Sequence, residues 1–180
     1  QKNELNIPTT GILTDFKFHP YWEEALRNNY VIVPNEMLIY QSIEKGFKPS
    51  QIIPTGIPIN PKFAVSVSKE TARKKLGLDP AKHTLLVMAG SMGYGKMADN
   101  ILKLDSLDSS VDFQIISVCG NNAAMKEKID SLKTERTVLN FGFATNVDLL
   151  MDAADCIVSK PGGLTTSEAL AKKLPMLIVD

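Results

Sequence analysis

Short apolar runs of strand length alternate with segments of helical period along almost the whole chain. Apolar residues that recur about every three or four positions indicate amphipathic helices, whereas short apolar runs bounded by turn residues indicate buried strands. Strands that alternate with helices form a parallel sheet, because each connection crosses back over the sheet before the next strand begins. The sequence therefore predicts an α/β protein with a Rossmann-like parallel sheet and helices on both of its faces.

The expected elements follow from this alternation. Strands are expected over residues 11–15, 30–34, 51–53, 84–89, 113–119, 137–141, 156–159 and 176–179. Helices are expected over residues 36–45, 69–76, 96–104, 122–132, 147–153 and 165–172. Asn146 and Thr165 are the expected caps of the last two helices, since their side chains can accept a hydrogen bond from a free helical amide.

A proline-rich segment interrupts the pattern between residues 53 and 69, where Pro54, Pro58 and Pro61 follow one another closely. Proline is disfavoured in helix interiors and in central strands, so this segment is expected to connect two domains. We expect a first domain over residues 1–62 and a second over residues 63–180.

Charge and cysteine content narrow the possible functions. The 20 Lys and Arg residues balance 20 Asp and Glu residues, so no net field attracts the chain to nucleic acid. No apolar segment approaches the roughly 18 residues that a membrane-spanning helix needs, and no signal peptide opens the chain. Cys119 and Cys156 are expected to be reduced thiols of a cytoplasmic protein. Because the chain starts at Gln1 and stops at Asp180, directly after a strand, we expect a piece of a larger enzyme.

The first glycine-rich junction is LLVMAGSMGYGKMADN, residues 85–100, in which Gly90, Gly93 and Gly95 follow an expected strand. Backbone amides can approach an anion closely where no Cβ intervenes. A Walker A loop is one interpretation, but Met97 replaces its Mg²⁺-binding hydroxyl. A dinucleotide loop is another, but the next strand ends without the acidic residue that binds ribose. A tight turn without a ligand is the third interpretation.

The second junction is SKPGGLTTSEALAKK, residues 159–173, which connects an expected strand to an expected helix. Amides in the first turn of that helix would lie at the carboxyl edge of the sheet, where open α/β sheets bind ligands. A diphosphate would meet unpaired N–H groups and the positive end of the helix dipole there. The spacing of Thr165 and Glu168 also fits a capping box, which spacing alone favours.

Longer stretches resemble a known family. FGFATNVDLLMDAADCIVSKPGGLTTSEALAKKLPMLIVD, residues 141–180, resembles the nucleotide-binding segment of GT-B glycosyltransferases, above all the processive diacylglycerol glucosyltransferases and the monogalactosyldiacylglycerol synthases. The lipid II-forming N-acetylglucosaminyltransferase of peptidoglycan synthesis is a more distant relative. TDFKFHPYW, residues 14–22, resembles an element of the glycolipid synthases, and GIPI, residues 56–59, resembles their domain junction. The resemblance covers nearly the whole chain and keeps the order of the motifs.

The resemblance implies a donor site for a UDP-sugar in the second domain. Glu168 would hold the ribose hydroxyls and Phe143 would lie beside the uracil, although packing in the core is the alternative for Phe143. The residues implied against the diphosphate are Gly162, Gly163, Leu164 and Thr165, and those of the phosphate-side loop are Gly90, Ser91, Met92 and Gly93.

The first domain would be the end of an acceptor domain. His19 and Trp22 are the acceptor-side candidates there, with packing within that domain as the alternative. The catalytic base of the family would lie before residue 1, so no catalytic residue is assigned in this chain.

The activity implied is the inverting transfer of a hexose from a UDP-sugar to diacylglycerol or a glycolipid. The sequence contains no D-x-D element, so we expect no metal and no other cofactor. The full-length enzyme would associate peripherally with the inner face of the plasma membrane and bind no nucleic acid. The alternatives are a UDP-GlcNAc-dependent peptidoglycan transferase and a non-catalytic module that binds a nucleotide sugar.

Overall fold

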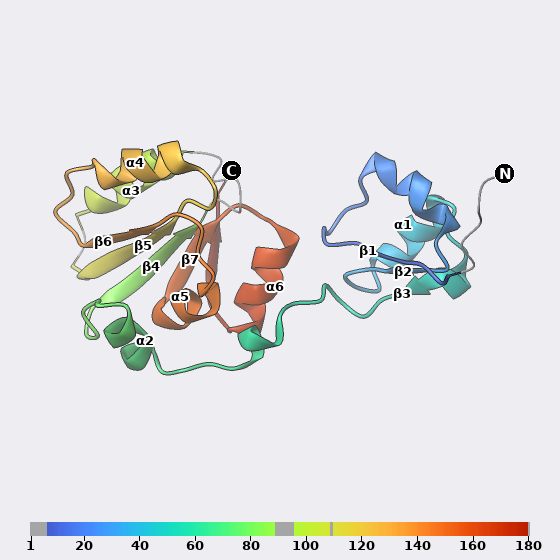
Figure 1. Cartoon of the computed structure of the whole chain (residues 1–180), viewed down its shortest axis with the longest axis horizontal. Coiled ribbons are helices and arrows are strands. Elements are labelled where there is room, and N and C mark those ends of the chain that lie inside the picture. The colour runs from blue at the N-terminus through green and yellow to red at the C-terminus, as the bar shows by residue number, and fades with distance from the viewer. Residues whose placement is uncertain (1–6, 89–95, 109, 180) are drawn as a thin grey trace. The chain divides into compact units, whose positions relative to one another are not determined.

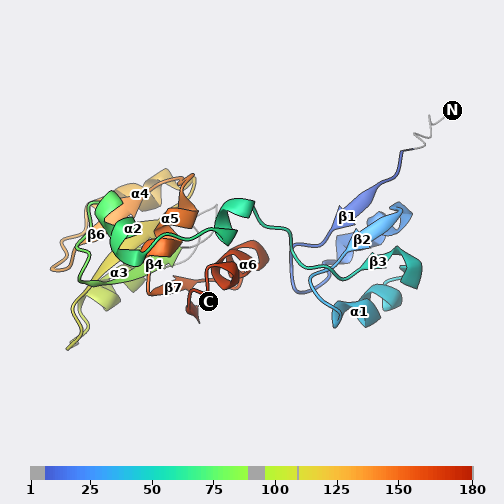
Figure 2. The same cartoon turned by 90° about the horizontal axis from the view of Figure 1, so that it is seen from below.

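The computed structural model describes residues 7–88, 96–108 and 110–179. The chain divides into two compact units, Gln1–Ile59 and Asn60–Asp180, each of which is described by itself (Figure 1, Figure 2). The division falls between Ile59 and Asn60, whereas the proline pattern placed it after residue 62.

The first unit is built on a three-stranded parallel sheet. Its strands β1 (Thr10–Ile12), β2 (Tyr30–Ile32) and β3 (Ile52–Ile53) lie in the order β1-β2-β3. The helix α1 (Leu38–Glu44) and the 3₁₀ segments η1 (Pro20–Arg27) and η2 (Pro49–Gln51) complete the unit. Its core consists of buried apolar residues from these strands and their connections: Leu13, Phe18, Val31, Val33, Leu38 and Phe47.

The second unit contains a five-stranded sheet in which all neighbouring strands are parallel. Its strands are β4 (His83–Met88), β5 (Phe113–Val118), β6 (Val138–Phe141), β7 (Cys156–Ser159) and β8 (Met176–Ile178). Its helices are η3 (Pro61–Ala64), α2 (Lys69–Lys75), α3 (Met97–Asp105), α4 (Ala123–Asp130), α5 (Val147–Ala153) and α6 (Gly163–Ala171). The predicted parallel α/β sheet is confirmed.

Helices cover both faces of this sheet. Figure 1 shows α3 and α4 on one side of it and α2 and α5 on the other. Met97 and Ile101 of α3 and Ile129 of α4 pack with Val87 and Ile115 of the central strands in one buried cluster. Every residue of β5 is buried, as expected for a central strand covered on both faces.

The strand order is β6-β5-β4-β7-β8, so the chain moves outward in one direction and then returns to the other side of β4. This reversal places β7 beside β4, with Met88 opposite Ser159 at the carboxyl ends of the two strands. In open parallel sheets, ligands bind outside the carboxyl ends at such a switch point. The two glycine-rich junctions therefore leave the sheet from adjacent strands.

Candidate functional site

The junction between β7 and α6 begins the site. Gly162 adopts an extended conformation, with φ −88° and ψ 132°, and is the N-cap of a helix that starts at Gly163. The prediction that Thr165 caps this helix is wrong, because Thr165 lies two residues inside its first turn. Glycine is an acceptable N-cap because its backbone adopts the required conformation easily. No side-chain hydrogen bond caps this helix.

Three amides at the start of α6 remain free for a ligand. The first bond of the helix runs from the Thr166 amide to the Gly162 carbonyl over 2.9 Å, so the preceding amides of Gly163, Leu164 and Thr165 have no acceptor among the described residues. A Cβ added at Gly162 would meet no atom within 4 Å. Packing within the described part of the chain therefore leaves open space in front of Gly162.

Glu168 lies one turn further along α6 and is partly buried. The capping box is wrong, because the N-cap is Gly162 and the Glu168 carboxylate accepts no hydrogen bond from any described residue. Burial raises the pKa of Glu168, and the nearby Lys62 ammonium opposes that shift. The fold thus holds this carboxylate where burial disfavours its charge, and its oxygens have no hydrogen-bond partner among the described residues.

Phe143 lies in the connection between β6 and α5, at the same carboxyl edge. Its side chain is 66% exposed, so packing in the core, which the sequence left open for it, is wrong. Asn146 stands at the predicted N-cap of α5, but its side chain makes no capping hydrogen bond. The Leu149 amide instead bonds to the Asn146 carbonyl.

Lys62, near the start of the second unit, contacts the connection between β6 and α5 and the first turn of α5. No sequence pattern predicted this role. The Lys62 Nζ donates to the Thr145 carbonyl over 2.7 Å and forms an ion pair with Asp148 Oδ1 over 2.9 Å. No local signal could have identified it, since its partners lie more than 80 positions away along the chain.

The phosphate-side loop of Gly90, Ser91, Met92 and Gly93 lies outside the described residues. The strand that leads into it, β4, ends at Met88 beside Ser159. The Ser159 hydroxyl is buried there and has no hydrogen-bond partner among the residues that the structure describes.

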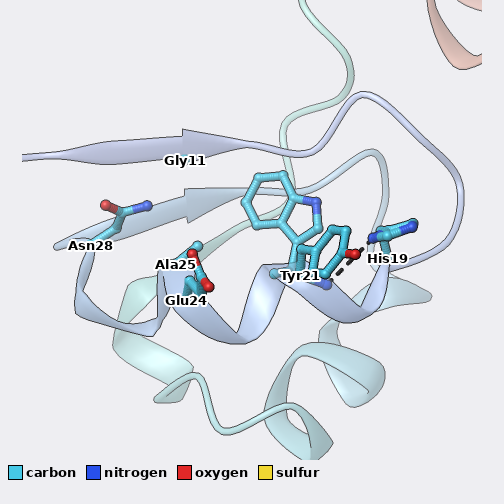
Figure 3. A pocket seen from close by; sticks show the side chains of 7 residues that line it. Gly11, His19, Tyr21, Glu24, Ala25 and Asn28 are labelled. Carbon is cyan, nitrogen blue, oxygen red and sulfur yellow. Dashed lines mark hydrogen bonds between the residues drawn. The ribbon is translucent and has the colours of Figure 1, made fainter.

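A surface hollow of about 540 Å³ in the first unit contains both acceptor-side candidates (Figure 3). His19 caps η1, since its Nδ1 accepts from the Tyr21 amide over 3.4 Å. The Trp22 ring packs edge-on against Phe18 with 6.0 Å between ring centroids. Each side chain thus packs within its own unit and also lines the hollow, together with Gly11, Tyr21, Glu24, Ala25 and Asn28.

The described residues contain neither a cluster of metal ligands nor a membrane-spanning helix. They contain no group of three or more His, Cys, Asp or Glu side chains that could hold a metal ion. None of their helices is long and apolar enough to cross a membrane.

Solved structures of glycosyltransferases share this fold. A glycosyltransferase from Rickettsia africae ESF-5 matches 93% of this chain and 50% of its own, with TM-score 0.58 and 17% identity. Anabaena Alr3699/HepE, solved in complex with UDP and glucose, matches 94% of this chain and 52% of its own, with TM-score 0.58 and 20% identity. The predicted GT-B glycosyltransferase fold is confirmed.

Sequence comparison gives the family. Residues 1–59 match the monogalactosyldiacylglycerol (MGDG) synthase family, and residues 84–179 match the glycosyltransferase family 28 C-terminal domain. The processive diacylglycerol beta-glucosyltransferase of Bacillus pumilus (strain SAFR-032) is 36% identical over 174 residues, which are 96% of this chain and 45% of that protein. The chain belongs to the glycosyltransferase family 28 C-terminal domain family, whose model matches more than half of it. It spans less than half the length of this relative.

Proposed function

We propose that the full-length protein is an inverting glycosyltransferase that transfers a hexose from a UDP-sugar to diacylglycerol in glycolipid synthesis. The second unit is its donor domain. The observation that carries this proposal is the switch point between β4 and β7, where the free amides of α6, Glu168 and the exposed Phe143 gather at the carboxyl edge. The family match and the names of the relatives support the same activity.

The donor would bind through three contacts. The amides of Gly163, Leu164 and Thr165 and the helix dipole meet the diphosphate, whose negative charge grows as the bond to the sugar breaks. Glu168 accepts hydrogen bonds from the ribose hydroxyls, and the Phe143 ring packs on the flat uracil. Because these amides are fixed before the reaction, we propose that they stabilise the leaving UDP without a resident metal or another cofactor.

The acceptor would bind to the first unit. The hollow lined by Trp22 and His19 offers an amphipathic ring and a polar nitrogen to a glycerolipid or glycolipid. With this acceptor, the full-length enzyme would work as a cytoplasmic protein that associates peripherally with the inner face of the plasma membrane.

Calorimetric titration of the chain with UDP, ADP and NAD tests the donor site. UDP should bind most tightly, and Glu168→Gln should weaken its binding roughly 10- to 150-fold, which corresponds to the loss of about 1.5–3 kcal/mol for a charge-assisted hydrogen bond. The melting temperature of this variant should not fall, because burial raises the pKa of Glu168 and its charge therefore disfavours the folded state at neutral pH. Glu127→Gln, at an exposed position of α4, is the matched control.

A lower melting temperature with unchanged UDP affinity would show a purely structural role for Glu168 and contradict the donor site. Assays of the full-length protein on diacylglycerol and on the lipid-linked peptidoglycan precursor test the acceptor. Transfer only to the latter would favour the peptidoglycan transferase, and transfer to neither would favour a nucleotide-sugar-binding module.

A further inference from the structure

Lys62 is held in a fixed position at the start of the second unit. The Asn60 side chain caps η3 by accepting a hydrogen bond from the Lys62 amide over 3.1 Å. The adjacent Phe63 is 3% exposed, which anchors η3 in the unit. The Lys62 side chain therefore extends from a fixed backbone.

The Lys62 ammonium meets the segment that carries Phe143. It donates to the Thr145 carbonyl over 2.7 Å and pairs with Asp148 Oδ1 in the first turn of α5 over 2.9 Å. These two contacts lie on either side of the α5 N-cap, so they fix the end of the connection that begins after β6.

The segment that carries Lys62 also contacts the helix that carries Glu168. Residues of η3 contact α6, and the Lys62 charge lowers the pKa of Glu168 against the effect of burial. The charged groups around Lys62 are thus Asp148 from α5 and Glu168 from α6, and Lys62 is the only described residue whose charge is found to shift Glu168.

We propose that Lys62 is a positioning residue of the nucleoside site, whose ammonium holds the Phe143 connection through Thr145 and Asp148 and serves Glu168 as a counter-charge. This inference rests on the proposed function. Lys62 acts through residues that touch the nucleotide and need not touch it itself. Without the ammonium, Asp148 and Glu168 lose their shared counter-charge, and the carboxylate that binds ribose is protonated at a higher pH.

The test compares Lys62→Met with wild type in UDP titrations from about pH 5 to pH 8. UDP affinity should fall as Glu168 becomes protonated, and this fall should begin at higher pH in Lys62→Met, so the ratio of its affinity to that of wild type should be lowest within that pH range. Lys62→Arg should restore the wild-type profile. An NMR titration of the Glu168 carboxyl in the free protein should show its midpoint raised by Lys62→Met.

Two controls separate this role from a general effect on the fold. Lys82 forms a comparable ion pair at the amino edge of the sheet, with its Nζ 2.8 Å from Asp112 Oδ2. Its side chain is 37% exposed, against 36% for Lys62. Lys82→Met should therefore leave the pH profile of UDP affinity unchanged. In the Glu168→Gln background, Lys62→Met should no longer shift the pH dependence of UDP affinity. The pH dependence that comes from the UDP phosphate itself should remain.

The outcomes distinguish this inference from the proposed function. If wild type binds UDP but Lys62→Met leaves both the affinity profile and the Glu168 midpoint unchanged, the inference is overturned and the function stands. If wild type binds no UDP, the donor site itself is refuted and the positioning role with it.

Discussion

Substitution of Gly162 by alanine tests whether the start of α6 holds a diphosphate. The backbone of Gly162 has φ −88° and ψ 132°, which any residue can adopt, and an added Cβ meets no atom within 4 Å. Compared with glycine, alanine lowers the conformational entropy of the unfolded chain, which stabilises the folded state by about 0.4–1 kcal/mol. Alanine is also a poorer N-cap than glycine, which destabilises the folded state by a similar amount. The free energy of unfolding should therefore change by less than about 1 kcal/mol.

The effect on UDP affinity should be much larger. The methyl group would occupy the open space through which a phosphate oxygen reaches the free amides of α6. Losing one charge-assisted hydrogen bond costs about 1.5–3 kcal/mol, which corresponds to a roughly 10- to 150-fold weaker affinity. Isothermal titration calorimetry with UDP and a thermal melt of the same sample measure the two quantities separately.

Gly77→Ala is the contrasting control. Gly77 follows α2 with φ 71°, a left-handed conformation that alanine adopts at a cost, so this variant should lose stability and keep its affinity for UDP. If Gly162→Ala stays folded and binds UDP within about twofold of wild type, the diphosphate does not lie against these amides, and the donor site at the switch point is refuted.

Two further predictions concern stability. Lys172 and Asp152 form an ion pair of 2.8 Å with side chains 1% and 7% exposed, so Lys172→Met should lower the unfolding free energy by about 3–5 kcal/mol in urea titrations. A loss below about 1 kcal/mol would contradict this. Burial opposes the charge of Asp155, but hydrogen bonds from Lys69 and the Thr84 amide and the charge of Arg73 outweigh it and lower its pKa. The charge of Asp155 should thus stabilise the folded state above about pH 4 and lose this effect in acid. The loss of unfolding free energy caused by Asp155→Asn should therefore be smaller at pH 3 than at pH 7, and an equal loss at both pH values would refute this prediction.

Local pattern predicted the elements of the second unit because most residues of each strand are apolar. Residues 156–159 and 147–153 form β7 and α5 with the expected bounds, and the six residues of β5 are all buried. The order of the strands was not predictable in this way. The adjacency of β4 and β7 pairs residues about 70 positions apart, such as Leu85 with Cys156, and no local pattern encodes that pairing.

Errors arose where backbone conformation or long-range contact decides the structure. A cap was expected at Thr165 because threonine has a side-chain oxygen that can accept a hydrogen bond from a helical amide. The helix instead begins after Gly162, which has no side chain to accept one. The 3₁₀ segment η1 was not expected, although Pro20 at its start and the His19 cap are recognisable afterwards. Lys62 contacts Thr145 and Asp148, which are close to it only in the folded unit.

The carboxyl edge differs from the rest of the second unit in how its polar groups are satisfied. Away from this edge, Lys172 pairs with Asp152. At the edge, the first amides of α6 lack acceptors among the described residues, Glu168 has a raised pKa, and Phe143 is exposed. Each feature costs stability or contributes none, and such local costs tend to collect at functional sites. A ligand with an anionic diphosphate, a pair of hydroxyl groups and a flat ring would relieve all three, and a uridine diphosphate has these groups in that order.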